Sequence, residues 1–335
     1  MSGLFDRELQ AGLEAVRKAA DVCRRVQAEI TPEVLAKKDQ SPVTVADFAS
    51  QAIVCRHLEM MFPDDPVIGE EGAAELRAES GSAFLGQVVQ HLAGVGIMGS
   101  GDDVCRWIDR GGQQEHCDRF WTLDPIDGTK GFLRREQYAI SLALIVNGRI
   151  EVGILGCPNM SPNAGESGPG AGVLAWAVRT QGSWSQPLGP TTTAASRLKV
   201  TSTGNSGDAR FCESVESGHS AHDWSGMIAA ELGIRREPFR IDSQCKYLAV
   251  ARGDADLYLR LPTKKGYVEK IWDHAGGVLV VEEAGGRVTD IHGHDVEFHH
   301  GASLKANQGM IVTNGLLHNQ TIAAVMNHAP QDFRR

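Results

Sequence analysis

The sequence predicts a mixed α/β protein, and two observations lead to this fold class. In the first half, helical periodicity precedes two apolar runs, residues 138–146 and 150–155, which flank the turn-forming dipeptide Asn147-Gly148. In the second half, short strand patterns alternate with helical patterns, which is typical of an α/β layer. We therefore expect helices packed on an antiparallel sheet, followed by a second α/β unit.

The domain organisation follows from length and linker composition. With 335 residues, the chain is long enough for one large or two medium domains. Residues 161–172 and 186–195 are rich in Gly, Pro, Ser and Thr, as linkers commonly are. We expect a boundary near residue 190, with an N-terminal domain of helices and an antiparallel sheet over residues 1–190 and a C-terminal α/β domain over residues 191–335.

The composition excludes several classes of protein. The content of 42% hydrophobic and 22% charged residues is ordinary for a globular protein with a sizeable core. The formal net charge of -9 argues against a general nucleic-acid binder or membrane-surface binder, because such proteins are usually basic. No apolar run is long enough to span a bilayer, and the N-terminus lacks a secretion signal. We expect a cytoplasmic protein, or an organellar one if a transit peptide has been removed.

The seven cysteines form no C-x-x-C pair. Their odd number predicts reduced thiols rather than a disulfide framework or a zinc site. Cys105 and Cys117 fall in one polar, Gly-rich stretch. We interpret them as two free loop thiols, with a pair formed under oxidation as the alternative.

Two helices are expected near the N-terminus. Apolar residues recur at helical spacing over residues 4–30 and again over residues 49–61. Thr44 or Asp47 would cap the second helix. The functional alternative for Asp47 is that it faces a catalytic site and helps to deprotonate a water.

The next segment places two acidic residues at the end of a short strand. Residues 66–72 read as a buried strand that ends in Glu70 and Glu71, and buried acids need a partner or a metal. Glu70 is the better ligand candidate because it lies nearer the apolar run. Residues 77–119 are polar and Gly-rich, with a helix expected around 84–92 and the remainder interpreted as a surface excursion or flap over the site.

The remaining elements are predicted from the same patterns. Further strands are expected at residues 173–178, 210–216, 256–261, 288 and 310–312, and further helices at residues 219–232, from 242–246 onward and over 272–285.

The stretch from Phe120 to Phe132 contains a bend with two carboxylates. A strand-like run ends in Asp124, where Pro125 is expected to stop the ladder because proline has no backbone donor. Asp127-Gly128 then forms a tight turn. As an isolated motif, the bend could equally be an ordinary structural turn.

The ligands that this bend offers are all oxygen atoms. The carbonyl of Ile126 lies between the two carboxylates, and Thr129 adds a hydroxyl beside them. Hard divalent cations such as Mg²⁺ prefer such ligands. Backbone N–H groups after the turn would be available for a phosphate oxygen.

A further acid, Asp273, stands where the last apolar helix begins. It would either cap that helix or join Glu70, Asp124 and Asp127 in a site with enough carboxylates for two or three Mg²⁺ ions. The sequence has no C-x₅-R, no phosphate-binding G-x-x-x-x-G-K-[ST] loop and no G-x-S-x-G motif.

These residues resemble a known family. The paired segments Asp124-Pro-Ile-Asp-Gly-Thr129 and Trp272-Asp-His-Ala-Gly-Gly277, together with Gly69-Glu70-Glu71, are similar to the signatures of the inositol monophosphatase superfamily of Mg²⁺-dependent, lithium-sensitive phosphatases. Within it, the chain resembles the fungal and plant 3′(2′),5′-bisphosphate nucleotidases. That likeness lies in residues 41–47, 131–134, 156–159, 217–220, 242–247, 258–262 and 269–274.

The resemblance implies a fold, a reaction and a set of site residues. The implied fold is a layered α/β/α/β/α sandwich of the inositol monophosphatase and fructose bisphosphatase type. The implied reaction is removal of the 3′-phosphate from adenosine 3′,5′-bisphosphate, and from its 5′-phosphosulfate analogue. We also expect a monomer that binds neither nucleic acid nor membrane. The implied metal ligands are Glu70, Asp124, the Ile126 carbonyl, Asp127 and Asp273; the implied catalytic residues are Asp47 and Thr129; and the implied substrate contacts are Gly128, Thr129, His219, Ser243, Lys246, Arg260 and Asp273.

Most implied metal ligands thus belong to the N-terminal domain, and most implied substrate contacts belong to the C-terminal domain. Lys246 and Arg260 suit a 5′-phosphate because both are cationic, although either would also serve as a surface charge. Two other functions stay open: an inositol phosphatase of the same superfamily, and a non-catalytic sensor of the bisphosphate nucleotide.

Overall fold

A computed structural model describes residues 3–30, 41–166, 170–189, 192–215 and 222–334. Within these residues, seven strands form a first sheet in the order β1 (Val67–Gly69), β2 (Arg119–Asp127), β3 (Ala139–Val146), β4 (Arg149–Cys157), β5 (Val173–Val178), β6 (Gly182–Pro187) and β7 (Ser196–Arg197). β1 pairs with β2 in parallel, and every other pair is antiparallel. The β3–β4 hairpin turns at Asn147 and Gly148, which both have positive φ as the predicted type I′ turn requires.

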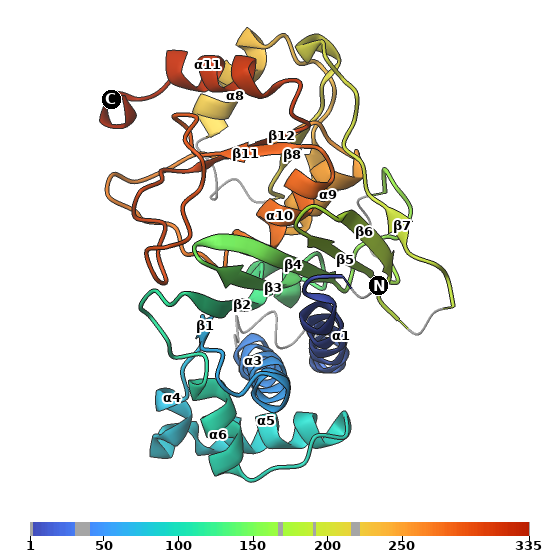
Figure 1. Cartoon of the computed structure of the whole chain (residues 1–335), viewed down its shortest axis with the longest axis vertical. Coiled ribbons are helices and arrows are strands. Elements are labelled where there is room, and N and C mark those ends of the chain that lie inside the picture. Colours follow the sequence, from blue (N-terminus) through green and yellow to red (C-terminus); the bar gives the residue numbers. More distant parts are fainter. Residues whose placement is uncertain (1–2, 31–40, 167–169, 190–191, 216–221, 335) are drawn as a thin grey trace.

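Two long helices cover one face of this sheet. α1 (Asp6–Ala28) and α3 (Ser41–Met61) lie side by side beneath the strands (Figure 1). α1 buries a continuous apolar stripe that includes Val16 and Cys23, as its predicted amphipathic pattern requires. The helix over residues 4–30 and the strands at 138–155 and 173–178 were therefore predicted correctly.

A second sheet lies on the other side of two central helices. Its described strands follow the order β11 (Arg287–Thr289), β12 (Met310–Thr313), β10 (Leu257–Arg260), β8 (Phe211–Glu213) and β9 (Phe239–Arg240). α9 (Cys245–Arg252) and α10 (Ala275–Glu283) fill the space between the sheets, and α8 (His222–Glu231) and α11 (His318–Asn327) cover the outer face (Figure 1). The predicted α/β/α/β/α sandwich is confirmed.

The central helices pack closely because one of them carries glycine at the contact. A Cβ at Gly277 of α10 would collide with the ring of Tyr247 on α9. Both helices are apolar on most sides, since they contact sheet on two faces, and Val278, Leu279 and Leu248 are fully or almost fully buried. This layer holds the second half of the chain against β3 and β4 of the first sheet, and β3 is the neighbour of β2, which carries the acidic bend.

The predicted surface excursion is wrong over much of its length. After α4 (Ala74–Arg77), a 3₁₀ turn (Glu79–Gly81) and α5 (Ser82–Gly94), residues Gly101–Asp109 form α6. A capping box between Ser100 and Asp103 starts α6, and Trp107 and Ile108 are buried against the rest of the protein. Cys105 is buried on this helix rather than lying in a loop with Cys117, and both are free thiols.

Two capping predictions are also wrong. α3 begins at Ser41, so Thr44 and Asp47 lie inside the helix and do not cap it. The N-cap of α10 is His274, so Asp273 precedes the cap position. The domain boundary expected near residue 190 falls on a pair of residues outside the described ranges.

Short elements complete the described part of the chain. These are α7 (Thr129–Leu133) and the 3₁₀ turns Ser206–Asp208 and Gln331–Phe333. Among the described helices, none combines the length and the apolar character needed to cross a bilayer.

Candidate active site

The acidic bend lies where β2 is interrupted. Asp124 pairs with Ser141 of β3 and Asp127 pairs with Ala139, so two residues of β2 bulge opposite one residue of β3. The ladder, which Pro125 was expected to stop, therefore resumes at Asp127. Gly128 then adopts φ +95°, and a Cβ there would come within 2.9 Å of Ser243. The bulge therefore lies between the two carboxylates, and directly after it Gly128 comes close to Ser243, which lies just before α9.

Gln244 joins this bend to the second half of the chain. Its backbone N–H donates to Oδ2 of Asp127, and its side-chain Nε2 donates to the carbonyl of Trp272 over 2.9 Å. Its Oε1 accepts a 3.0 Å hydrogen bond from the Ser141 hydroxyl. Because Gln244 is 2% exposed, these bonds form in a dry environment. They fix the position of Asp127 relative to the segment that carries Asp273.

Four of the predicted metal ligands influence one another electrostatically. Burial, followed by the charges of Glu71 and Asp273, raises the pKa of Glu70 to about 7. Burial raises the pKa of Asp273 to about 6, with the charge of Asp127 acting in the same direction and His274 opposing it. Burial and the charge of Glu70 also raise the pKa of Asp124 well above its usual value. The acids that are far apart in sequence thus lie within electrostatic range of one another.

The donor set fits hard divalent cations. Oδ1 of Asp124 is buried without a hydrogen-bond partner among the described residues. A buried carboxylate oxygen with no donor, beside further carboxylates, is costly unless a cation neutralises it. We call Glu70, Asp124, Asp127 and Asp273 the acid cluster. Their oxygen ligands are of the kind that Mg²⁺ prefers.

The two predicted catalytic residues lie on different helices. Asp47 is 8% exposed on α3, and burial, followed by the charges of Glu71 and Glu70, raises its pKa well above the usual value. Thr129 is exposed and begins α7. Asp47 and Thr129 share no hydrogen bond in the described part of the chain, although α3 and α7 pack together.

A pocket of about 370 Å³ opens beside the acid cluster. It brings together seven of the predicted site residues: Asp127, Gly128, Thr129, Ser243, Lys246, Arg260 and Asp273. Glu70, Asp124 and Asp47 are not in its wall. His219 lies outside the described residues.

The pocket combines anionic and cationic groups. Lys246 is 5% exposed, with its Nζ 5.2 Å from the centroid of the Tyr258 ring, and burial lowers its pKa. Arg260 reaches Glu269 through two hydrogen bonds of 3.3 and 3.4 Å. The two cations and the carboxylates of Asp127 and Asp273 therefore line one space, which suits a ligand that carries phosphate groups.

Sequence reasoning missed a buried network behind the pocket. Tyr247 Oη lies 2.7 Å from Nδ1 of His274, and His274 Nε2 lies 3.4 Å from Glu269. Although desolvation opposes it, the hydrogen bond and charge of His274, together with Arg260, lower the pKa of Glu269 to about 2. Glu269 and His274 flank Asp273 in sequence, and this proximity was the signal available for finding them.

Comparison with known proteins places the chain among relatives of similar length. A 3′(2′),5′-bisphosphate nucleotidase of Schizosaccharomyces pombe is 43% identical over 323 residues, covering 92% of this chain and 91% of its own. Proteins of the same name from Emericella nidulans and Oryza sativa are 40% and 42% identical to this chain. Both alignments span 96% of this chain, and they span 98% of the Emericella nidulans protein and 94% of the Oryza sativa protein.

Solved structures with the same fold are more distant in sequence. An IMPase of Thermotoga maritima superimposes with a TM-score of 0.64 at 18% identity, covering 97% of this chain and 99% of that one. SuhB of Mycobacterium tuberculosis gives a TM-score of 0.62 at 20% identity, covering 96% and 97%. The inositol monophosphatase family model matches residues 5–329. The chain therefore belongs to the inositol monophosphatase family, as its paired acidic signatures predicted.

Proposed function

We propose that the protein is a Mg²⁺-dependent phosphatase that removes the 3′-phosphate of adenosine 3′,5′-bisphosphate to give AMP and phosphate. The 5′-phosphosulfate analogue is the expected second substrate. The observation that carries this proposal is the pocket in which Asp127 and Asp273 lie with Lys246 and Arg260. A substrate with one phosphate would need only the acid cluster and the metal ions that it holds. A second phosphate on the substrate accounts for the presence of Lys246 and Arg260 in the same pocket. The relatives named 3′(2′),5′-bisphosphate nucleotidase support the same substrate class.

The acid cluster and the carbonyl of Ile126 would hold two or three Mg²⁺ ions. Mg²⁺ keeps part of its coordination shell open, so the 3′-phosphate of the substrate would complete it. When bound, the ions would offset the charge of the phosphoryl oxygens and lower the pKa of a water. Without them, burial of the carboxylates, followed by the charges of neighbouring acids, raises the pKa values of Glu70 and Asp273.

The protein's own groups then orient the reactants. Asp47 accepts the proton of the attacking water, and its raised pKa makes its carboxylate a stronger base than an exposed Asp would be. Thr129 orients the water through its hydroxyl. Gly128 lets the backbone pass close to Ser243, and both residues line the pocket in which the substrate would bind. Ser243, Lys246 and Arg260, with His219, contact the nucleotide part of the substrate, and the cationic Lys246 and Arg260 suit its 5′-phosphate.

We propose that the protein acts as a monomer, in which one chain supplies both the acid cluster and the cations Lys246 and Arg260. The substrate is a small molecule, in keeping with a family that acts on small phosphate esters. The formal net charge of -9 does not prevent this, since cations held by the acid cluster reverse the local sign.

Phosphate release from two substrates, measured with Mg²⁺ and with EDTA, tests the proposal. Adenosine 3′,5′-bisphosphate should be hydrolysed in Mg²⁺ with a kcat/KM at least about a hundredfold above that for inositol 1-phosphate, and EDTA should abolish both activities. A preference for the inositol ester would assign the other phosphatase function. Tight binding of the nucleotide without phosphate release in Mg²⁺ would instead indicate a sensor, and either result would reject the proposal.

A further inference from the structure

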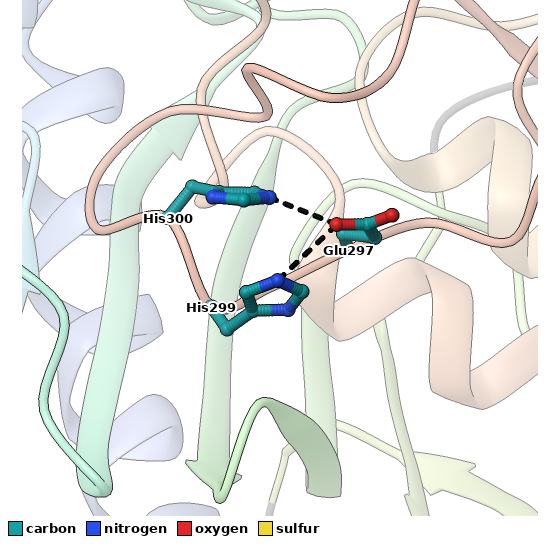
Figure 2. Close-up of side chains that lie close together, drawn as sticks. All are labelled: Glu297, His299 and His300. Carbon is teal, nitrogen blue, oxygen red and sulfur yellow. Dashed lines mark hydrogen bonds and ion pairs between the residues drawn. The ribbon is translucent and has the colours of Figure 1, made fainter.

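Three side chains of the types that can ligate a metal ion lie together outside the active-site pocket. Glu297, His299 and His300 belong to one loop between β11 and β12, and their side chains point toward one another (Figure 2). Nε2 of His300 lies 2.8 Å from Oε2 of Glu297, and Nε2 of His299 lies 3.2 Å from the same oxygen. All three donor atoms fall within 4.8 Å of one another. We call these three residues the Glu-His-His group.

The loop that carries the Glu-His-His group is held in place by its neighbours. Phe298, between the first two donors, is 3% exposed and packs in the core. The backbone N–H of Glu297 donates a 2.8 Å hydrogen bond to the buried Asn307. Gly301 has φ +74°, and the next residue, Ala302, donates its N–H to the carbonyl of Gln114 over 3.0 Å. The donors are therefore preorganised by packing rather than spread along a free loop.

The distances suit a small tetrahedral ion. Zn²⁺ binds imidazole nitrogen and carboxylate oxygen at about 2.1 Å, which places neighbouring ligand atoms about 3.4 Å apart. The separations of 2.8 and 3.2 Å, both to the same carboxylate oxygen, are about 0.6 and 0.2 Å shorter than that value. The side chains are 31% to 50% exposed, so water has access to a fourth position.

The charge balance also leaves room for a cation. In the described part of the chain, Glu297 forms ion pairs with His299 and His300 and with no Lys or Arg. Both imidazoles direct Nε2 at one carboxylate oxygen, so either protons or a metal ion must separate these electron-rich atoms. Two imidazoles and a carboxylate form a donor set that favours Zn²⁺ and similar transition metals. Mg²⁺, which prefers oxygen, is disfavoured.

We propose that the Glu-His-His group binds one divalent transition-metal ion, with Zn²⁺ as the expected ion, at a site separate from the acid cluster. The inference does not depend on the proposed phosphatase function. It rests on the geometry of three side chains, and hydrogen bonding among them without metal is the competing explanation.

The test is a Zn²⁺ titration of the full chain, purified without a histidine tag and metal-free, in saturating Mg²⁺ to occupy the acid cluster. Isothermal calorimetry should give one Zn²⁺ per chain, and the Zn²⁺ should raise the thermal midpoint. His299→Gln, His300→Gln and Glu297→Gln should each weaken Zn²⁺ binding at least about tenfold. His292→Gln is the matched control, because His292 lies in the same segment and bonds Gln308 instead; its Zn²⁺ affinity should equal that of the wild type.

Two further measurements distinguish loss of the metal site from loss of the fold. Co²⁺ bound in place of Zn²⁺ should give visible d–d absorption in the wild type and in His292→Gln but not in His299→Gln. Unchanged thermal midpoints of the metal-free variants would show that they fold. An absence of Zn²⁺ binding by the folded wild type, or equal affinity in His299→Gln, would overturn the proposal and leave the group as a hydrogen-bonded cluster.

Discussion

The backbone N–H of Gln244 donates a hydrogen bond to Oδ2 of Asp127, which connects the start of α9 to the bulge at the end of β2. The side chain of the same Gln244 holds Trp272, which directly precedes Asp273. One buried residue therefore fixes two of the predicted metal ligands relative to each other. This explains how acids separated by almost 150 positions come to share one pocket.

Replacing Gln244 should impair both stability and activity. Gln244→Ala removes the partners of the Trp272 carbonyl, the Ser141 hydroxyl and the Gly277 N–H. Unpaired buried polar groups of this kind should lower the free energy of unfolding by about 2–4 kcal/mol. Because the hydrogen bond to Trp272, which positions the adjacent Asp273, would be lost, kcat should fall at least about tenfold.

Urea unfolding and phosphate release measure these two effects. Gln90→Ala, at an exposed position on α5, is the control and should change neither quantity appreciably. A Gln244→Ala variant as stable and as active as the wild type would show that the hydrogen bonds do not position the site.

Asp124→Asn should separate stability from function. Burial and the charge of Glu70 raise the pKa of Asp124, so its ionised form destabilises the metal-free fold as pH rises through the folded-state pKa. The neutral amide removes this effect, so the free energy of unfolding in EDTA at pH 8 should rise by about 1 kcal/mol or more. Phosphate release in Mg²⁺ should fall about a hundredfold or more.

The exposed Asp64 provides the matched control for this substitution. Asp64→Asn should leave both the stability in EDTA and the activity near wild-type values. If Asp124→Asn instead destabilised the metal-free protein and kept its activity, Asp124 would be a structural residue and not a metal ligand.

Lys246 should discriminate between substrates with and without a 5′-phosphate. Lys246→Met keeps a long apolar chain beside Tyr258 but removes the charge. Loss of a charge-assisted contact of about 1.5–3 kcal/mol should lower kcat/KM for adenosine 3′,5′-bisphosphate at least about tenfold. The kcat/KM for adenosine 3′-monophosphate should change much less.

Steady-state kinetics on the two nucleotides provide the measurement, with the exposed Lys199→Met as the control. Equal losses for both nucleotides would place Lys246 near the 3′-phosphate or in the fold, and would contradict its assignment to the 5′-phosphate.

The sequence predicted the regular elements of the fold better than the contacts that assemble the site. Regular patterns such as the β3–β4 hairpin and α1 were predicted because periodicity and turn chemistry are local. α6 was missed because its segment is polar and Gly-rich overall, and its buried face of Trp107 and Ile108 becomes evident only against α3. The helix starts at Ser41 and Ala275 ruled out Asp47 and Asp273 as caps, and the catalytic role of Asp47 and the metal-binding role of Asp273 stay predictions.

The convergence of the site depends on contacts that no local pattern contains. Gln244 matters because it forms hydrogen bonds to Asp127, Ser141 and Trp272, which belong to three different segments. No motif around Gln244 in the sequence predicts these tertiary contacts. Glu269 and His274 likewise form their network with Arg260 and Tyr247 through tertiary packing. Motif resemblance supplied the acids, whereas the structure was needed to find the residues that hold them.

His318 should make the stability of the protein depend on pH. It is 1% exposed, its Nδ1 lies 2.9 Å from the Thr313 hydroxyl, and its Nε2 lies 3.0 Å from the Thr289 hydroxyl. Burial, followed by the charge of Arg287, lowers its pKa to about 4. Because the unfolded chain binds this proton near pH 6.5, stability is full above that pH and is lost as pH falls toward 4.

This residue alone should lower the free energy of unfolding by up to about 2 kcal/mol between pH 7 and pH 5. Urea unfolding at a series of pH values measures the slope, and His318→Gln should flatten it even if the variant is less stable throughout. His116→Gln, at an exposed position, should leave the slope unchanged. An unaltered slope in His318→Gln would assign the pH dependence to other groups.

The most direct test of the central claim is Mg²⁺-dependent phosphate release from adenosine 3′,5′-bisphosphate by the wild type and by Asp127→Asn. The asparagine can still accept the Gln244 hydrogen bond, so the fold and its thermal midpoint should be preserved. The account predicts rapid release by the wild type in Mg²⁺, none in EDTA, and a loss of about a thousandfold in the variant. Near-normal turnover by folded Asp127→Asn, or full wild-type activity in EDTA, would contradict it.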